Sequence, residues 1–216
     1  ILNGKHVVTL KVEMDVLVGP YLKRLAEERG VVYTGTAGDE PGSAMELYDF
    51  AKTLGFDVLA MCKGKNNPID YEATPESVAE KAKASGLTPS MLCSFIDGTN
   101  TMVELCAMAN ATGFTPDVPG GHGPEVTAEG LADKFSLKED GGILEHDYIV
   151  EYVRGVAPGV FVIVSHDSPV ITEEMSFLKV GKGPRFALFR PFHLTNIETP
   201  ISIARAVIFH SPTVVA

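Results

Sequence analysis

Residues 42–68 read GSAMELYDFAKTLGFDVLAMCKGKNNP, a stretch in which a helix pattern passes into a strand pattern and then into a polar loop. Ala44, Leu47, Tyr48, Ala51 and Leu54 recur at helical spacing, which predicts a helix with one apolar face. A glycine at position 55 would end the helix, and the apolar run 56–62 predicts a buried strand. The loop that follows, residues 63–68, carries two lysines and two asparagines.

The same alternation is found upstream of this stretch. Residues 5–10 and 31–38 are short, β-branched strand candidates. Between them lies a helix pattern that we expect to begin near Gly19, with Pro20 at its first position, and to end at Gly30. The order β-α-β-α-β predicts a parallel sheet whose three strands end on one edge, where open α/β sheets bind ligands.

Downstream, the pattern becomes less regular. Helices are expected within residues 75–86, 88–95, 101–113, 172–181 and 199–210, and a strand within 185–194. The segments 147–155 and 159–167 alternate like a pair of neighbouring strands joined by a short loop. Residues 113–126 are rich in glycine and proline and form a candidate sub-boundary. The expected fold class is therefore α/β, a parallel sheet continuing into an α+β segment.

Composition excludes several classes of partner. The net charge of −10 disfavours nucleic acid and anionic membrane surfaces. No apolar run approaches the ~20 residues of a membrane span, and no segment resembles a signal peptide. The three cysteines lie in apolar surroundings without metal-ligand spacing, which predicts reduced, buried thiols in a cytoplasmic protein. The histidines also lack metal-ligand spacing, and no GxGxxG motif or P-loop occurs.

The loop 63–68 is the strongest candidate for ligand binding. Lysines 63 and 65 could hold an anion, and Asn66 and Asn67 could bond to hydroxyl groups. The alternative is a solvated turn with incidental lysines. Lys11 and Glu13 share one face if the first strand continues, which makes Glu13 a candidate acid/base and Lys11 a candidate for substrate charge, unless they simply form an exposed strand end.

Three further groups could carry chemistry. Asp97 and Asn100 lie at a helix start, where capping is the alternative to a substrate contact. Arg190 and His193 interrupt an apolar run and therefore need partners or an anionic ligand. Asp39 and Glu40 are neighbouring carboxylates in the loop 38–42, and they either cap the next helix or have a catalytic or metal-binding role.

Several blocks of sequence resemble a known family. GKHVVT (4–9), GVVYTGTAGDEPG (30–42), GFDVLAMCKGKNNP (55–68) and RPFHLTNIETPISIARA (190–206) are similar to homoserine-dehydrogenase-like NAD(P)-dependent oxidoreductases that carry a C-terminal SAF domain. Within that family the resemblance is closest to the bacterial enzymes described as 1-deoxy-D-xylulose 5-phosphate reductoisomerase-like.

The resemblance implies a domain organisation. Residues 1–40 would be the C-terminal part of a dinucleotide-binding Rossmann domain, and residues 41–216 a catalytic and oligomerisation domain. A Rossmann fingerprint would lie upstream and an SAF domain downstream, so the chain would be a piece of a longer protein that forms a homodimer. The piece alone would be inactive.

The resemblance also implies an activity: isomerisation of a phosphorylated keto-sugar followed by hydride transfer from NADPH, in isoprenoid precursor synthesis. The alternatives are a homoserine-type or sugar-acid dehydrogenase, and a non-enzymatic sugar- or acid-sensing domain. Reductoisomerases bind Mg²⁺ or Mn²⁺ through clustered carboxylates, so the resemblance makes such an ion a possible cofactor. No such cluster is visible locally in the sequence, and Glu13, Asp39 and Glu40 could form one only through folding, so we assign no metal ligand. The residue roles expected on this basis are catalysis by Lys65, Glu13 and Asp97, substrate binding by Lys63, Asn66, Asn67, Asn100, Arg190 and His193, and cofactor binding by Thr9 and Lys11.

Overall fold

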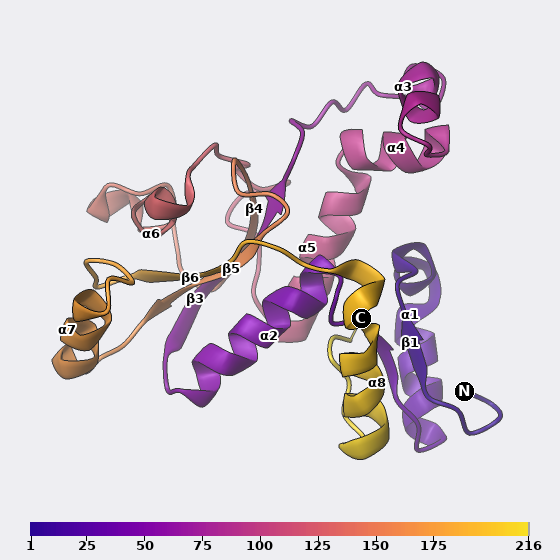
Figure 1. Cartoon of the computed structure of the whole chain (residues 1–216), viewed down its shortest axis with the longest axis horizontal. Helices are drawn as coiled ribbons and strands as arrows, with labels where there is room; N and C mark the ends of the chain where they lie inside the picture. Colours follow the sequence, from indigo (N-terminus) through magenta and orange to yellow (C-terminus); the bar gives the residue numbers. More distant parts are fainter. Residues whose placement is uncertain (216) are drawn as a thin grey trace.

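The computed structural model describes residues 1–215, which fold into two separate β-sheets and their covering helices (Figure 1). The strands are β1 (Val7–Thr9), β2 (Tyr33–Gly35), β3 (Asp57–Lys65), β4 (Ile149–Arg154), β5 (Val160–Ser165) and β6 (Phe186–Arg190). The helices are α1 (Val12–Glu28), α2 (Glu40–Thr53), α3 (Ala79–Ala84), α4 (Pro89–Ile96), α5 (Thr99–Thr112), α6 (Leu131–Lys134), α7 (Pro169–Phe177) and α8 (Thr199–Ile208). Single 3₁₀ turns lie at Ala128–Gly130, Lys138–Asp140 and Thr195–Glu198. The predicted α/β class is confirmed.

The first sheet contains β1 and β2, which pair in parallel with α1 as their crossover. The predicted start of this helix near Gly19 is wrong, because α1 already begins at Val12 and contains Pro20. Contacts of α1 with β2 and α5 hold the helix together across the proline, so tertiary packing overrides the local preference. The strand β2 also meets the C-terminal segment through an antiparallel bridge between Gly35 and Val214.

The second sheet has the strand order β4-β3-β5-β6. The expectation that β3 joins β1 and β2 in one parallel sheet is wrong, because both edges of β3 are occupied by later strands: β4 pairs with it in parallel and β5 in antiparallel. The expected pairing of 147–155 with 159–167 is wrong for the same reason, since β3 lies between them. Alternation indicates that a segment is a strand, but it does not indicate its neighbour.

Helices and loops cover both faces of the second sheet. On one face α2 and α5 pack against the sheet, contributing Ala51, Leu105 and Met108 to the larger core cluster. The other face is covered by the segment around α6, with Leu131, Phe135 and Leu144 buried. Because β3 is an inner strand of this sheet and lies between two such layers, polar residues on it are forced into the interior.

The hairpin of α3 and α4 is set apart from these layers (Figure 1). It has a small cluster of its own, built around Val78, Ala82 and Leu92, and it packs mainly against α5. Two of the cysteines are buried as expected, but Cys106 is exposed on α5, so that part of the thiol prediction is wrong. Among residues 1–215, none of the helices combines the length and apolar character that a bilayer crossing requires.

Candidate active site

The two lysines predicted to lie in a loop belong instead to the last three residues of β3. Lys63 and Lys65 are two positions apart, so both side chains leave the same face of the strand, the face covered by α2 and α5. Gly64 between them allows the chain to approach the β4–β5 loop, because a Cβ at this position would lie 2.6 Å from Ala157 Cα. The lysines are therefore fixed by the sheet instead of being mobile in a turn.

Lys63 is buried and tied to two carboxylates. Its Nζ donates to Glu40 Oε1 at 3.0 Å and also to a carboxylate oxygen of Glu104. Glu40 is the first residue of α2, whereas Glu104 faces the sheet from the middle of α5. The ammonium thus links both helices to β3.

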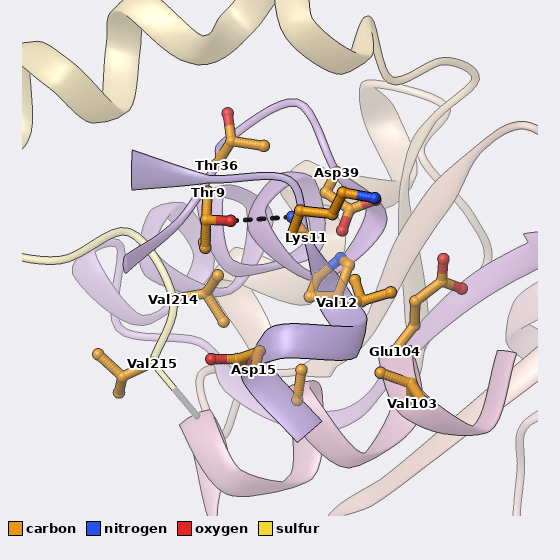
Figure 2. A pocket seen from close by; sticks show the side chains of 13 residues that line it. Thr9, Lys11, Val12, Asp15, Thr36, Asp39, Val103, Glu104, Val214 and Val215 are labelled. Carbon is orange, nitrogen blue, oxygen red and sulfur yellow. Dashed lines mark hydrogen bonds between the residues drawn. The ribbon is translucent and has the colours of Figure 1, made fainter. Parts of the chain in front are cut away.

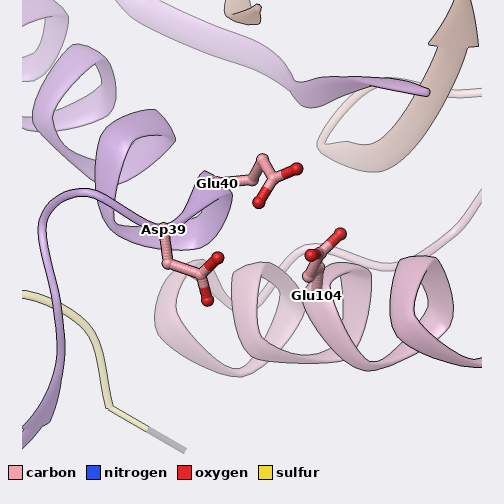
Figure 3. A group of neighbouring side chains, drawn as sticks. All are labelled: Asp39, Glu40 and Glu104. Carbon is pink, nitrogen blue, oxygen red and sulfur yellow. The ribbon is translucent and has the colours of Figure 1, made fainter. Parts of the chain in front are cut away.

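The acidic partners of Lys63 form a group with Asp39 (Figure 3). One oxygen of each of Asp39, Glu40 and Glu104 lies within 4.8 Å of the others. Asn100 donates from its amide to Glu104 Oε1 at 2.5 Å, one helical turn away. His193 donates from Nδ1 to the Gly38 carbonyl at 2.8 Å, which leaves its Nε2 3.5 Å from Glu40 Oε1.

Burial and repulsion between the carboxylates give the three acidic side chains of this group different pKa values. Burial raises the pKa of Glu104 to about 8, and Glu40 and Asp39 add to the increase although Lys63 opposes it. Burial beside Glu40 raises the pKa of Asp39 to about 7. Burial would raise the pKa of Glu40 too, but Lys63 and His193 outweigh it and bring that pKa down to about 2. Burial also works against the charged form of Lys63, and Glu104 and Glu40 outweigh it so that the pKa is raised.

Lys65 has a different environment. Its Nζ donates to the Phe95 carbonyl at 2.6 Å, and that is the one hydrogen bond of this ammonium to the part of the chain that the structure describes. Partial burial, followed by the charge of Lys63, lowers the pKa of Lys65. A cation with one neutral partner retains two N–H donors for an anionic or carbonyl ligand.

A cleft with a volume of about 490 Å³ opens in front of these groups, within the size range of small-molecule sites. Its walls come from the start of α1, the start of α2, the end of β3, helices α4 and α5, the β4–β5 loop and the segment before α8. Eight of the candidate residues line it: Lys11, Glu13, Lys63, Lys65, Asn66, Asn67, Asn100 and His193.

A second, small cavity of about 30 Å³ adjoins the acidic group (Figure 2). Thr9 and Lys11 line it where β1 ends, and the backbone N–H of Lys11 donates to Thr9 Oγ1 at 2.9 Å. Asp39 and Glu104 also line it. Lys11 lines both cavities, so the carboxyl end of β1 leads directly to the cleft.

Two candidate residues, Asp97 and Arg190, line neither of these two cavities. The carboxylate of Asp97 accepts the Thr99 backbone N–H at 2.8 Å, so it caps the start of α5. Arg190 donates to Glu46 at 3.1 Å and also to Glu198, with its guanidinium 4.9 Å from the Phe192 ring centre. Both side chains therefore have partners within the protein. For Asp97 the sequence left open a role at the start of the helix, and for Arg190 it left open protein partners in place of a ligand.

Glu104 is the participant that sequence reasoning missed. Its signal was present: it lies three residues after Thr101 and four before Met108, on the buried side of a helix that has no other charged residue. A carboxylate in such a position is almost never buried without a partner. Its partner comes from a strand about 40 residues earlier, which local patterns do not indicate.

A comparison with protein families found a match for residues 38–199, over most of the chain, to the family described as oxidoreductase DRL, catalytic domain. The chain belongs to this family. At this level it is an oxidoreductase catalytic domain of the reductoisomerase-like type, which confirms the coarser part of the expected identity and activity. The DRL match begins just before α2 and includes the whole cleft-bearing sheet. A comparison with curated proteins found no match.

The acidic group can be compared with the divalent-metal site that reductoisomerase chemistry implies. Three carboxylates within 4.8 Å are the ligand type that Mg²⁺ and Mn²⁺ prefer. The Lys63 ammonium, however, already contacts two of these carboxylates. While Lys63 holds this position, the group does not fit a divalent cation.

Proposed function

We propose that the chain is the catalytic part of an NADPH-dependent, reductoisomerase-like oxidoreductase that acts on a phosphorylated keto-sugar of the 1-deoxy-D-xylulose 5-phosphate type, in isoprenoid precursor synthesis. The observation that carries the proposal is the cleft, in which a largely unneutralised lysine lies beside three amide side chains. Such a combination suits a ligand with several hydroxyl groups and negative charge.

Substrate binding rests on the end of β3 and its neighbours. Lys65 binds an anionic or carbonyl oxygen of the substrate, because its ammonium has two donors left after the bond to Phe95. Asn66 and Asn67 bond to hydroxyl groups of the substrate, and Asn100 lines the cleft from α5, where its amide nitrogen already donates to Glu104 and its amide oxygen is left to accept from a hydroxyl group. Asp97 and Arg190 are outside this proposal, since both have protein partners.

Proton transfer falls to two ionisable side chains that line the cleft, Lys65 and Glu13. The lowered pKa of Lys65 makes it a better acid near neutral pH than an ordinary lysine. Glu13 projects from the first turn of α1 into the same cleft and is the second candidate. Isomerisation of a keto-sugar needs a proton moved between adjacent oxygens, and these two groups flank the space available for them.

The cofactor approaches over the carboxyl end of β1. Parallel strands present ligand sites at this end, and Thr9 and Lys11 lie there at the border of the cleft. Residues 1–40 then belong to the dinucleotide-binding domain, and the remaining strands of that domain and an SAF domain lie elsewhere in the full-length protein. The homodimer is part of this proposal, and sedimentation of the full-length protein measures it.

The test is NADPH oxidation by the full-length protein against three classes of substrate: keto-sugar phosphates, amino alcohols with their aldehydes, and sugar acids. The proposal expects turnover with the first class and a strong loss in Lys65→Ala. Turnover with an amino alcohol alone would establish the homoserine-type alternative. Tight sugar binding that NADPH does not alter, without turnover, would establish a sensor. Wild-type kinetics in Lys65→Ala would refute the assigned role of Lys65.

A further inference from the structure

Lys63 poses a question that substrate binding does not answer. It lines the cleft, yet its side chain is only 5% exposed and its ammonium is directed at Glu40 and Glu104. A lysine that bound an anionic ligand would not already donate to two acidic side chains of the protein. Its neighbour Lys65, two positions along the same strand, contacts a carbonyl and, within residues 1–215, no carboxylate.

The geometry points to Lys63 as the resident cation of the group formed by Asp39, Glu40 and Glu104: its ammonium occupies the place of a divalent ion, and the site takes no such ion while Lys63 is present. The consequence for catalysis rests on the proposed function, whereas the binding property does not.

Three features of the structure support this inference. First, the oxygens of the three carboxylates converge from two helices on one small region (Figure 3), and that region is reached by a cation from β3. Second, the backbone of Lys63 is fixed in the ladder between β4 and β5, where it is paired with Tyr152 on one side and Val160 on the other. The ammonium is therefore delivered by a rigid element and not by a loop.

Third, a buried lysine that left this position would lose both ion pairs. An isolated buried charge is strongly unfavourable, so the ammonium would have to move into the cleft to make room. Mg²⁺ would in addition have to shed part of its water shell and find near-octahedral geometry. The carboxylates would hold a divalent ion only after the built-in cation had been removed.

The chemical role follows from position. In metal-dependent reductoisomerases a divalent ion supplies positive charge near the reacting oxygens. Here Lys63 supplies that charge at the inner wall of the cleft, next to Lys65. Turnover by the full-length protein should then persist after treatment with a chelator, at a rate within about twofold of the untreated protein.

The test measures Mn²⁺ binding by electron paramagnetic resonance, so it does not depend on activity. Four forms of the full-length, chelator-treated protein are compared: wild type, Glu104→Gln, Lys63→Met and Lys63→Met combined with Glu104→Gln. Met is unbranched like lysine and only one heavy atom shorter, and it carries no charge. We expect Lys63→Met to bind Mn²⁺ at least about 100-fold more tightly than wild type, and the double variant to lose that gain.

Two outcomes would overturn the inference. One is a Mn²⁺ ion bound by the wild type and lost in Glu104→Gln, which would show that the carboxylates take a metal in the presence of Lys63. The other is a folded Lys63→Met protein that binds no additional Mn²⁺. Lys63→Gln serves as the second variant if Lys63→Met does not fold, with the same expectations. Failure to find any substrate would refute the proposed function but would leave these binding results decisive.

Discussion

Replacement of Lys63 by methionine tests how the site is held together. The ammonium lies 3.0 Å from Glu40 Oε1, and the two side chains are 5% and 16% exposed. At an effective dielectric constant of about 20, unit charges at this separation attract by about 5 kcal/mol, and desolvation offsets part of that. Removing one partner of a buried pair costs about 3–5 kcal/mol, since the other charge is left without compensation. We expect Lys63→Met to lower the free energy of unfolding by this amount at pH 8.

The penalty should shrink at lower pH. Without the lysine, the pKa values of Asp39 and Glu104 rise further above their unfolded values, and Glu40 loses the charge that lowers its pKa most. The variant is therefore most stable at low pH and loses stability as pH rises through the folded pKa values. Each proton retained by the folded state contributes about 1.4 kcal/mol per pH unit. At pH 5.5 the difference from wild type should therefore be at most about half of that at pH 8.

The assay is urea unfolding of the full-length protein, followed by circular dichroism at pH 5.5 and pH 8. Lys81→Met, on the exposed side of α3, is the matched control and should stay within about 0.5 kcal/mol of wild type. Adding Glu104→Gln to Lys63→Met should restore at least half of the lost stability, because one buried charge is removed. The reasoning is refuted if Lys63→Met is as stable as Lys81→Met at pH 8, or equally destabilised at both pH values.

Three further predictions concern the same region. In the wild type, the pKa values of Asp39 (about 7) and Glu104 (about 8) are raised, so both groups contribute stability that is present below their unfolded pKa values near 4 and is lost as pH rises to 8. Glu104→Gln should therefore make the fall in unfolding free energy between pH 5 and pH 8 shallower. If urea titrations give the same pH dependence for this variant as for wild type, the assignment is contradicted. Lys65→Met should lower kcat/KM by about 10- to 100-fold, the effect of a lost charge-assisted hydrogen bond, whereas Lys81→Met should not; equal kinetics in the two variants would remove Lys65 from the site. Gly64→Ala should lower the unfolding free energy by about 1–3 kcal/mol, because its Cβ would lie 2.6 Å from Ala157 Cα. If the variant melts at the same temperature as wild type, the β4–β5 loop moves to accommodate the Cβ without a measurable cost, and the prediction is wrong.

Local patterns predicted the elements around the site better than their pairing. The periodicity of residues 42–55 and the apolar run 56–62 were sufficient to predict a helix and then a strand, although α2 begins at Glu40 and β3 extends to Lys65. The partners of β3 are strands that begin roughly 90 residues later, and nothing in their alternation encodes which edge they occupy. The β-α-β-α-β order therefore suggested one parallel sheet, whereas the chain forms a two-stranded parallel sheet and a separate, mixed four-stranded sheet.

The site was predicted in part because its chemistry is concentrated in one stretch. The lysines and asparagines at 63–67 do line the cleft, together with Lys11 and Glu13 from the first strand-to-helix connection. The sequence did not reveal that the two lysines differ. Their distinction depends on Glu104, which reaches Lys63 from α5, and on the Phe95 carbonyl, which reaches Lys65 from α4. Both contacts are set by helix packing.

The central claim is that the cleft at the end of β3 binds an anionic, polyhydroxylated substrate. The most direct measurement is amide chemical-shift perturbation on the full-length protein with NADP⁺ bound, as 1-deoxy-D-xylulose 5-phosphate is added. We expect the largest shifts at Lys65, Asn66, Asn67 and Asn100, with no change at Lys81. The absence of shifts at these positions, or shifts confined to another surface, would contradict the account.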